Sequence, residues 1–184
     1  MSITLRPARP ADAEEMARWF ADEADLAQWA GPDIDFPLTP GHLSMWNDEA
    51  SAGRTRTCFT AVDGGDRPIG YFQLVNDAKN QLVRIARFGI SPAMRGKGFG
   101  QALFALIVAK AFDELHAHRV ELGVWTVNTR AQRLYEQAGF VHEGTARESS
   151  FIGGRRYSTN TMSLLRPEWR RSWAEVAMRP AAVA

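Results

Sequence analysis

The stretch FGISPAMRGKGFG, residues 88–100, determines how the rest of this sequence is interpreted. It begins with the end of an apolar run typical of a strand, Leu82 to Ile90, and finishes with the start of a run typical of a buried helix, Gly98 to His116. The glycines at positions 96, 98 and 100 carry no side chain, so backbone N–H groups at the start of the helix can approach an anion closely. Arg95 and Lys97 add positive charge beside them. The stretch therefore predicts a binding site for a pyrophosphate group.

Two other nucleotide-binding loops fit these residues less well. A Walker sequence requires Ser or Thr directly after its Gly-Lys pair, whereas Gly98 follows Lys97 here. A dinucleotide fingerprint requires glycine at position 101, which is Gln101, and a place after the first strand of a parallel unit. A turn that only starts a helix is the ordinary structural explanation of such glycines. Their place between a strand and a buried helix favours the binding role.

The remaining pattern predicts one mixed α/β domain over residues 1–168 and a C-terminal tail over residues 169–184. The turn at residues 63–66 predicts a hairpin, and with the next strand it gives three neighbouring antiparallel strands. The expected strands are Ile3–Arg6, Phe59–Val62, Pro68–Val75, Leu82–Ile90, Arg119–Trp125, Phe140–Glu148 and Arg156–Leu165. The expected helices of the second half are Gly98–His116 and Asn128–Ala138.

Residues 11–50 form a strongly acidic segment, with ten acidic residues and one basic residue. Its pattern predicts one helix that starts near Asp12 and includes Met16, Trp19 and Phe20, an irregular stretch over residues 31–40, and a second helix over residues 40–50. The rest of the chain is basic. The two parts are therefore expected to face different partners.

Composition excludes several classes of protein. The 184 residues are 45% hydrophobic, which suffices for one core, and the net charge of +1 does not support a nucleic-acid partner. The longest apolar run has eight residues, far short of the roughly 20 that span a membrane. Cys58 is the single cysteine, and the first ten residues lack the apolar stretch of a signal peptide, so we expect a cytoplasmic protein without disulfides. We expect no metal site.

A second group of residues follows the strand at 119–125. Asn128 stands where a helix N-cap belongs, and Tyr135 lies seven residues later, which returns it to nearly the same helix face. Taken separately, each residue has an ordinary explanation, as a cap and as a buried aromatic side chain. Taken together, both can point at one site.

These motifs resemble those of the GNAT superfamily of N-acetyltransferases. Residues 95–100 match its Q/R-x-x-G-x-G/A coenzyme A pyrophosphate loop, and residues 128–140 match its N-x-x-A-x-x-L-Y-x-x-x-G-F pattern. The likeness extends from about residue 68 to residue 165. The two ends, ITLRPARPADAEEM and MSLLRPEW, are similar to the branch that contains the ribosomal-protein N-terminal acetyltransferases.

The resemblance implies a mixed, largely antiparallel sheet flanked by helices, and acetyl transfer from acetyl-coenzyme A to a primary amine in a ternary complex. By the same resemblance, Tyr135 protonates the departing thiolate and Asn128 helps to hold the cofactor. A strand N–H near Ile90 would hold the oxyanion. The residues assigned to the cofactor are Phe88, Gly89, Ile90, Arg95, Gly96, Lys97, Gly98, Phe99, Gly100, Gln101, Asn128 and Tyr135.

The general base is open at this stage. Some relatives use a glutamate five residues before the asparagine, but that residue is Gly123 here. Glu121 lies on the same strand face and is one candidate, while Asp33, Asp35 and water are others. The four histidines lie outside the matched motifs and are interpreted as surface or packing residues.

We expect the acidic segment to form one wall of the acceptor pocket. Trp29, Asp33, Asp35 and Phe36 are the candidate contacts for a cationic amine, such as a protein N-terminus, a polyamine or an aminoglycoside. Two other classes compete: a coenzyme A-binding module without turnover, and a nucleotide-binding protein. The tryptophans at 169 and 173 suggest either a homodimer contact or a cap on the core.

Overall fold

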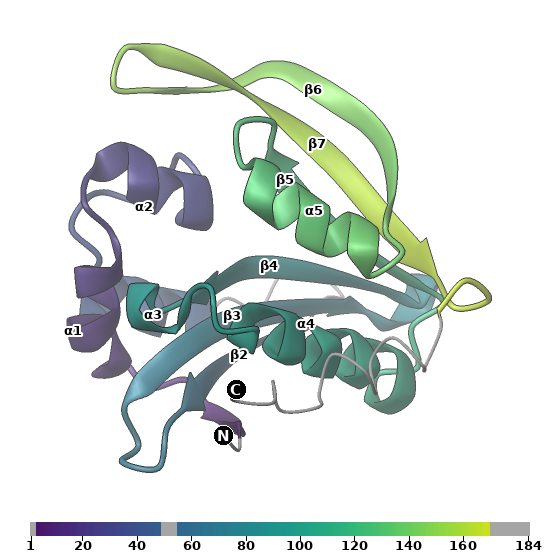
Figure 1. Cartoon of the computed structure of the whole chain (residues 1–184), viewed down its shortest axis with the longest axis horizontal. Coiled ribbons are helices and arrows are strands. Elements are labelled where there is room, and N and C mark those ends of the chain that lie inside the picture. The colour runs from purple at the N-terminus through teal and green to yellow at the C-terminus, as the bar shows by residue number, and fades with distance from the viewer. Residues whose placement is uncertain (1–2, 49–54, 170–184) are drawn as a thin grey trace.

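The computed structural model describes residues 3–48 and 55–169. Its strands are β1 (Thr4–Pro7), β2 (Thr55–Val62), β3 (Pro68–Asp77), β4 (Leu82–Ile90), β5 (Arg119–Trp125), β6 (Val141–Ile152) and β7 (Arg155–Leu165). Its α-helices are α1 (Asp12–Met16), α2 (Glu23–Ala30), α3 (Pro40–Asp48), α4 (Phe99–Ala109) and α5 (Thr129–Gln137). The strands of this described part form one sheet in the order β1-β2-β3-β4-β5-β7-β6 (Figure 1). Only β4 and β5 pair in parallel, so the expected mixed, largely antiparallel sheet is confirmed.

The sheet separates between β4 and β5. Their pairing starts at Leu82 and Arg119 and ends at Ile85 and Leu122, although β4 continues to Ile90. On their other edges, β4 remains paired with β3 and β5 with β7. The second half of β4 therefore has a backbone edge that faces no other strand of the described residues.

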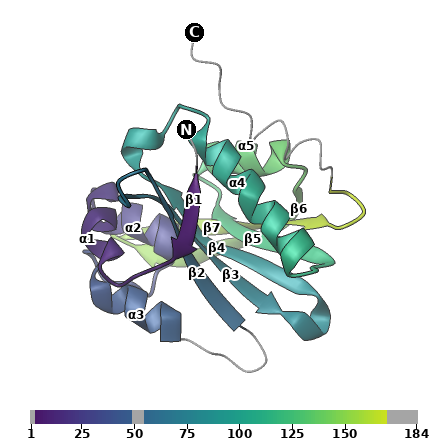
Figure 2. The same cartoon turned by 90° about the horizontal axis from the view of Figure 1, so that it is seen from below.

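The helices cover opposite faces of the sheet (Figure 2). Alternation along β3 sends Phe72 toward α4 and Tyr71 toward α1, α2 and α3. Because α4 is apolar over a wide arc, it packs closely enough that a Cβ at Gly70 would lie 2.5 Å from Leu103 Cδ2. The larger core lies between α4 and the sheet.

The acidic segment holds one helix more than the sequence predicted. The first helix ends at Met16, a 3₁₀ turn follows over Ala17–Trp19, and Phe20 is extended. A separate helix, α2, then begins, with the Asp22 side chain accepting the N–H of Asp25 at 2.9 Å. The prediction of two helices here was wrong, because this short N-capped helix was not recognised.

Trp169, the first residue of the expected tail, stacks on Phe112 with ring centroids 5.0 Å apart. It therefore packs on the core, which is one of the two roles considered for it. Trp173 lies outside the described residues. Within residues 3–48 and 55–169, no helix is long and apolar enough to cross a membrane.

Candidate active site

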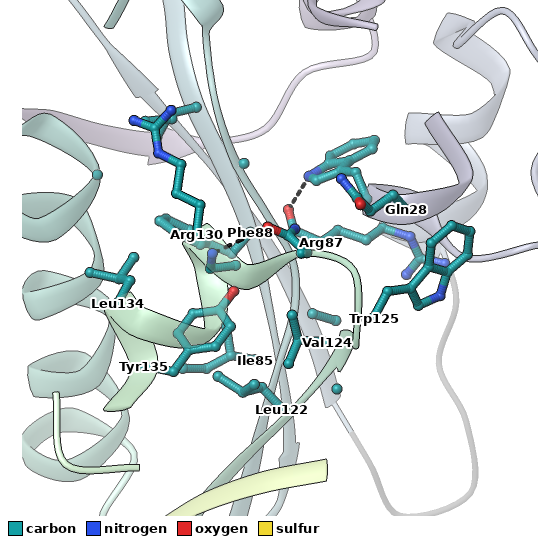
Figure 3. Close-up of a pocket in the computed structure, with 18 of the residues that line it drawn as sticks. Gln28, Ile85, Arg87, Phe88, Leu122, Val124, Trp125, Arg130, Leu134 and Tyr135 are labelled. Atoms are coloured by element: carbon teal, nitrogen blue, oxygen red, sulfur yellow. Dashed lines mark hydrogen bonds between the residues drawn. The ribbon is translucent and has the colours of Figure 1, made fainter. Parts of the chain in front are cut away.

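A cavity of about 1190 Å³ occupies the gap between β4 and β5. Residues of α2 line one end, and the loop before α4 and the first turns of α5 line the other. In Figure 3, Leu134 and Tyr135 lie on one side of the β4 residues and Gln28 and Trp125 on the other. The cavity therefore reaches both faces of the sheet, so two molecules can enter from opposite sides and meet within it.

The predicted phosphate loop forms one end of this cavity. Gly96 and Gly98 adopt φ angles of +77° and +74°, which side chains rarely allow, and a Cβ on either would meet nothing within 4 Å. Gly98 is the N-cap of α4, and within the described chain no side chain caps that helix. The N–H groups of the first turn and the positive end of the helix are thus offered to an anion.

Most predicted loop residues line the cavity, but two do not. Arg95 and Gln101 line it with the loop glycines, as do Phe88, Gly89 and Ile90 of β4. The side chain of Lys97 is exposed and outside the lining, and that of Phe99 is buried in the core. Of these last two, Phe99 can serve a ligand only through its backbone.

The start of α5 contributes a second helix N-terminus. The Asn128 side-chain oxygen accepts the N–H of Ala131 at 3.2 Å, so the predicted N-cap is present, and Asn128 also lines the cavity. Arg130 and Arg133, one turn apart on this helix, line it as well. Sequence reasoning missed both arginines, although their i, i+3 spacing beside the cap was visible.

Tyr135, in the second half of α5, also lines the cavity. It is buried, and its ring packs on Phe104 with centroids 4.9 Å apart. Burial raises the pKa of its hydroxyl above the usual 10, so the hydroxyl keeps its proton at neutral pH. In Figure 3 the hydroxyl points into the space between α5 and β4. The side chain can therefore donate a proton at that point.

The opposite end of the cavity belongs to α2 and the residues after it. Trp29 lines the cavity as predicted, but Asp33, Asp35 and Phe36 are exposed and lie outside the lining. Asp25, which the sequence analysis did not single out, is the one acidic side chain among the described lining residues. Recognising α2 would have revealed it, since Asp25 and Trp29 are one helical turn apart.

Glu121, the candidate base on β5, is not among the lining residues. Its carboxylate is paired with Arg119 at 3.1 Å and with Arg84 at 3.3 Å. These contacts leave Glu121 as a structural carboxylate, and the geometry gives no support to a role as base.

Positive charge dominates the cavity wall. Arg95, Arg130 and Arg133 lie at the end formed by the phosphate loop and α5. The other lining arginines are Arg56 of β2 and Arg84 and Arg87 of β4. The described residues contain no group of three or more His, Cys, Asp or Glu side chains that could hold a metal ion.

A family model described as an acetyltransferase (GNAT) domain matches residues 2–141. The chain therefore belongs to the GNAT family of acetyltransferases. It is 34% identical over 113 residues to spermidine N(1)-acetyltransferase of Vibrio cholerae serotype O1, covering 60% of this chain and 64% of that protein. It is 26% identical over 176 residues to the ribosomal N-acetyltransferase-like protein YdaF of Bacillus subtilis, covering 91% and 93%.

The fold is also similar to that of a solved structure, spermidine N-acetyltransferase from Vibrio cholerae in complex with CoA and spermine. The TM-score is 0.75 at 24% identity, and the match covers 90% of this chain and 96% of that one. At this level of identity the likeness establishes the fold alone. The chain spans less than two thirds of the first curated relatives that it matches, 64% and 60% of their lengths.

Proposed function

We propose that this protein transfers an acetyl group from acetyl-coenzyme A to a primary amine. The observation that carries the proposal is the cavity between β4 and β5, which has a glycine-rich anion site at one end and a carboxylate at the other. Acetyl-coenzyme A would supply the acetyl group as a reactive thioester and leave as the free thiol. The names of the relatives, which are acetyltransferases of amines, support the same reaction class.

The residues at the α4 and α5 end fit the polyanionic part of coenzyme A. The open space above Gly96 and Gly98 leaves room for phosphate oxygens beside the first N–H groups of α4. Arg95, Arg130 and Arg133 supply countercharge. The edge of β4 that faces no strand can pair with an extended amide-containing chain.

Tyr135 and the backbone of β4 would carry the chemistry. Backbone N–H groups near Phe88 to Ile90 can stabilise negative charge on the thioester oxygen. The Tyr135 hydroxyl holds a proton that the departing thiolate needs. Retention of this tyrosine in the cavity favours an enzyme over a binding module without turnover.

The acceptor would be a cationic amine that enters from the α2 side. Asp25 is suited to hold the ammonium group, and the aromatic ring of Trp125 is suited to its carbon chain. Because a protonated amine cannot attack, the proton must leave first, and water in the cavity is the simplest acceptor. This assignment replaces Asp33 and Asp35 by Asp25.

A screen for thiol release tests the proposal. Acetyl-coenzyme A is incubated with the protein and a panel of amines that includes N-terminal peptides, spermidine and aminoglycosides, and free thiol is measured. At least one amine should release thiol in proportion to its acetylated product, seen by mass spectrometry. Tight coenzyme A binding with no acetylation of any amine would instead indicate a binding module.

A further inference from the structure

β4 contains one residue more than the part of β3 that pairs with it. Tyr71 pairs with Gly89 and Gln73 pairs with Ala86, so two steps along β3 correspond to three along β4. Arg87 and Phe88 form this bulge, and Arg87 adopts φ +49°, a left-handed conformation unfavourable for a residue other than glycine. Such a conformation persists only where surrounding contacts hold it.

Trp29 of α2 supplies such a contact. Its indole Nε1–H donates to the carbonyl oxygen of Arg87 at 2.7 Å. The indole also lies close against the next part of the strand, because a Cβ at Gly89 would be 2.6 Å from Nε1. Three aromatic neighbours fix the indole itself: Phe20, Trp46 and Tyr71, with ring centroids 4.9, 5.8 and 5.5 Å away.

This contact sets the direction of a backbone donor. The Arg87 carbonyl and the Phe88 N–H belong to one peptide group, and in a planar trans peptide they point in opposite directions. Because α2 holds the carbonyl, the Phe88 N–H points away from α2. Phe88 has no partner residue in the ladder with β3, and it lines the cavity.

We propose that Trp29 is a positioning residue that aims the Phe88 N–H at the oxygen of the thioester. The inference rests on the proposed function and assigns Trp29 a role other than acceptor contact. The Arg87 side chain is also held, by Gln73 and by the Trp46 ring, but the indole N–H is what holds its carbonyl. Without that N–H, the donor on the other side of the peptide group is no longer pre-aimed. Asp25, the proposed contact for the acceptor, is one turn away from Trp29 on the same helix. Helix α2 therefore connects the acceptor site with the peptide group that carries the Phe88 N–H.

The first test is Trp29→Phe, which keeps an aromatic ring and removes the N–H. A positioning role predicts that kcat falls about tenfold or more, by the same factor for every acceptor, while the Kd of coenzyme A changes less than about twofold. An acceptor contact predicts a higher acceptor KM with kcat retained. That second pattern would overturn the proposal.

A second variant acts from the strand side and leaves α2 unchanged. Gly89→Ala places a Cβ against the indole and should therefore lower kcat to a similar extent. The φ of Gly89 is one that alanine can adopt, so the substitution does not strain the backbone. If both substitutions break one contact, the double variant should be about as active as either single variant. Losses that multiply in the double variant would contradict a shared mechanism.

The control is Trp19→Phe. Its buried indole nitrogen has no hydrogen-bond partner among the described residues, so the substitution removes the same group without that bond. Trp19 lines the same cavity, so the control also covers the effect of a changed ring in the lining. Its kcat should stay within about twofold of the wild-type value, and an equal loss there would show that the Trp29 effect does not come from the lost hydrogen bond.

A measurement without substrate separates this inference from the proposed function. In a ¹⁵N–¹H spectrum of the protein alone, Trp29→Phe should remove one downfield, slowly exchanging indole signal and shift the amide signals of residues 87–89. Unchanged amide signals would refute the positioning role even in an active enzyme. An enzyme that acetylates no amine, with those shifts present, would instead refute the proposed function.

Discussion

Gly98→Ala is the substitution that tests the phosphate loop most directly. A Cβ at Gly98 would meet nothing within 4 Å, so it creates no clash in the protein and projects into open space beside the loop. The cost to the fold comes only from the backbone, since alanine at φ +74° is strained. Gly154, in the turn between β6 and β7, offers a matched control with φ +76° and equally open surroundings.

The two substitutions should destabilise the protein to the same extent. A left-handed conformation costs about 1–2 kcal/mol for a residue other than glycine, partly offset by the smaller entropy of the unfolded chain. For a chain of this length, about 1 kcal/mol lowers Tm by about 2–4 °C. At Gly98 alone, a disturbed phosphate contact should also cost about 1.5–3 kcal/mol of binding energy, which is about tenfold to a hundredfold in Kd.

Thermal unfolding and calorimetric titration with coenzyme A measure both quantities. The expected result is equal Tm loss for the two variants and weaker coenzyme A binding for Gly98→Ala alone. If folded Gly98→Ala bound coenzyme A with wild-type affinity, the phosphate assignment would be wrong. Equal loss of affinity in Gly154→Ala would show that strain, rather than ligand contact, is responsible.

Three further substitutions address the proton donor, the acceptor and the fold. Tyr135→Phe should lower kcat about a hundredfold and leave the Kd of coenzyme A nearly unchanged, which pre-steady-state thiol release can measure. Asp25→Asn should raise the acceptor KM and weaken its dependence on ionic strength, whereas Glu23→Gln, an exposed change on the same helix, should do neither. Burial raises the pKa of Asp12, but hydrogen bonds from Arg6, the Arg9 N–H and Thr60 outweigh it and hold that pKa below 3.8. The stability that this carboxylate contributes is therefore present above pH 3.8 and lost as pH falls through the folded pKa. At pH 7, Asp12→Asn should be less stable than the wild type by about 3 kcal/mol, measured by denaturant titration. In acid, this difference in stability should close.

The parts of the site that depend on local chemistry could be predicted from the sequence. The glycines at 96 and 98 are needed because the chain turns into α4 with positive φ, a requirement of the neighbouring residues alone. The N-cap at Asn128 is equally local. Motifs of this kind fix both the geometry of a loop and its residue types.

Features that depend on distant pairing could not be predicted. The cavity exists because the ladder between β4 and β5 stops at Ile85 and Leu122, which are 37 residues apart in sequence. Strand alternation correctly put Glu121 on the face of Gly123, yet its ion pair with Arg84 of the neighbouring strand β4 comes from tertiary packing. The face on which a side chain lies follows from its own strand, whereas its ion-pair partners on other strands depend on how the whole sheet assembles.

Although residues 11–50 are strongly acidic, the proposed acceptor pocket is not. This difference limits the kind of amine that the proposed site can bind. Asp12 is paired with Arg6, and Glu15 with Arg18 and Arg67, on surfaces away from the cavity. Asp25 is left as the one carboxylate among the described lining residues, opposed by three arginines on β2 and β4. Like charges repel strongly in a partly enclosed space. A second ammonium group close to the first would therefore face arginine side chains rather than a carboxylate. The α2 side is thus suited to one ammonium group held at Asp25, with the rest of the acceptor directed toward solvent.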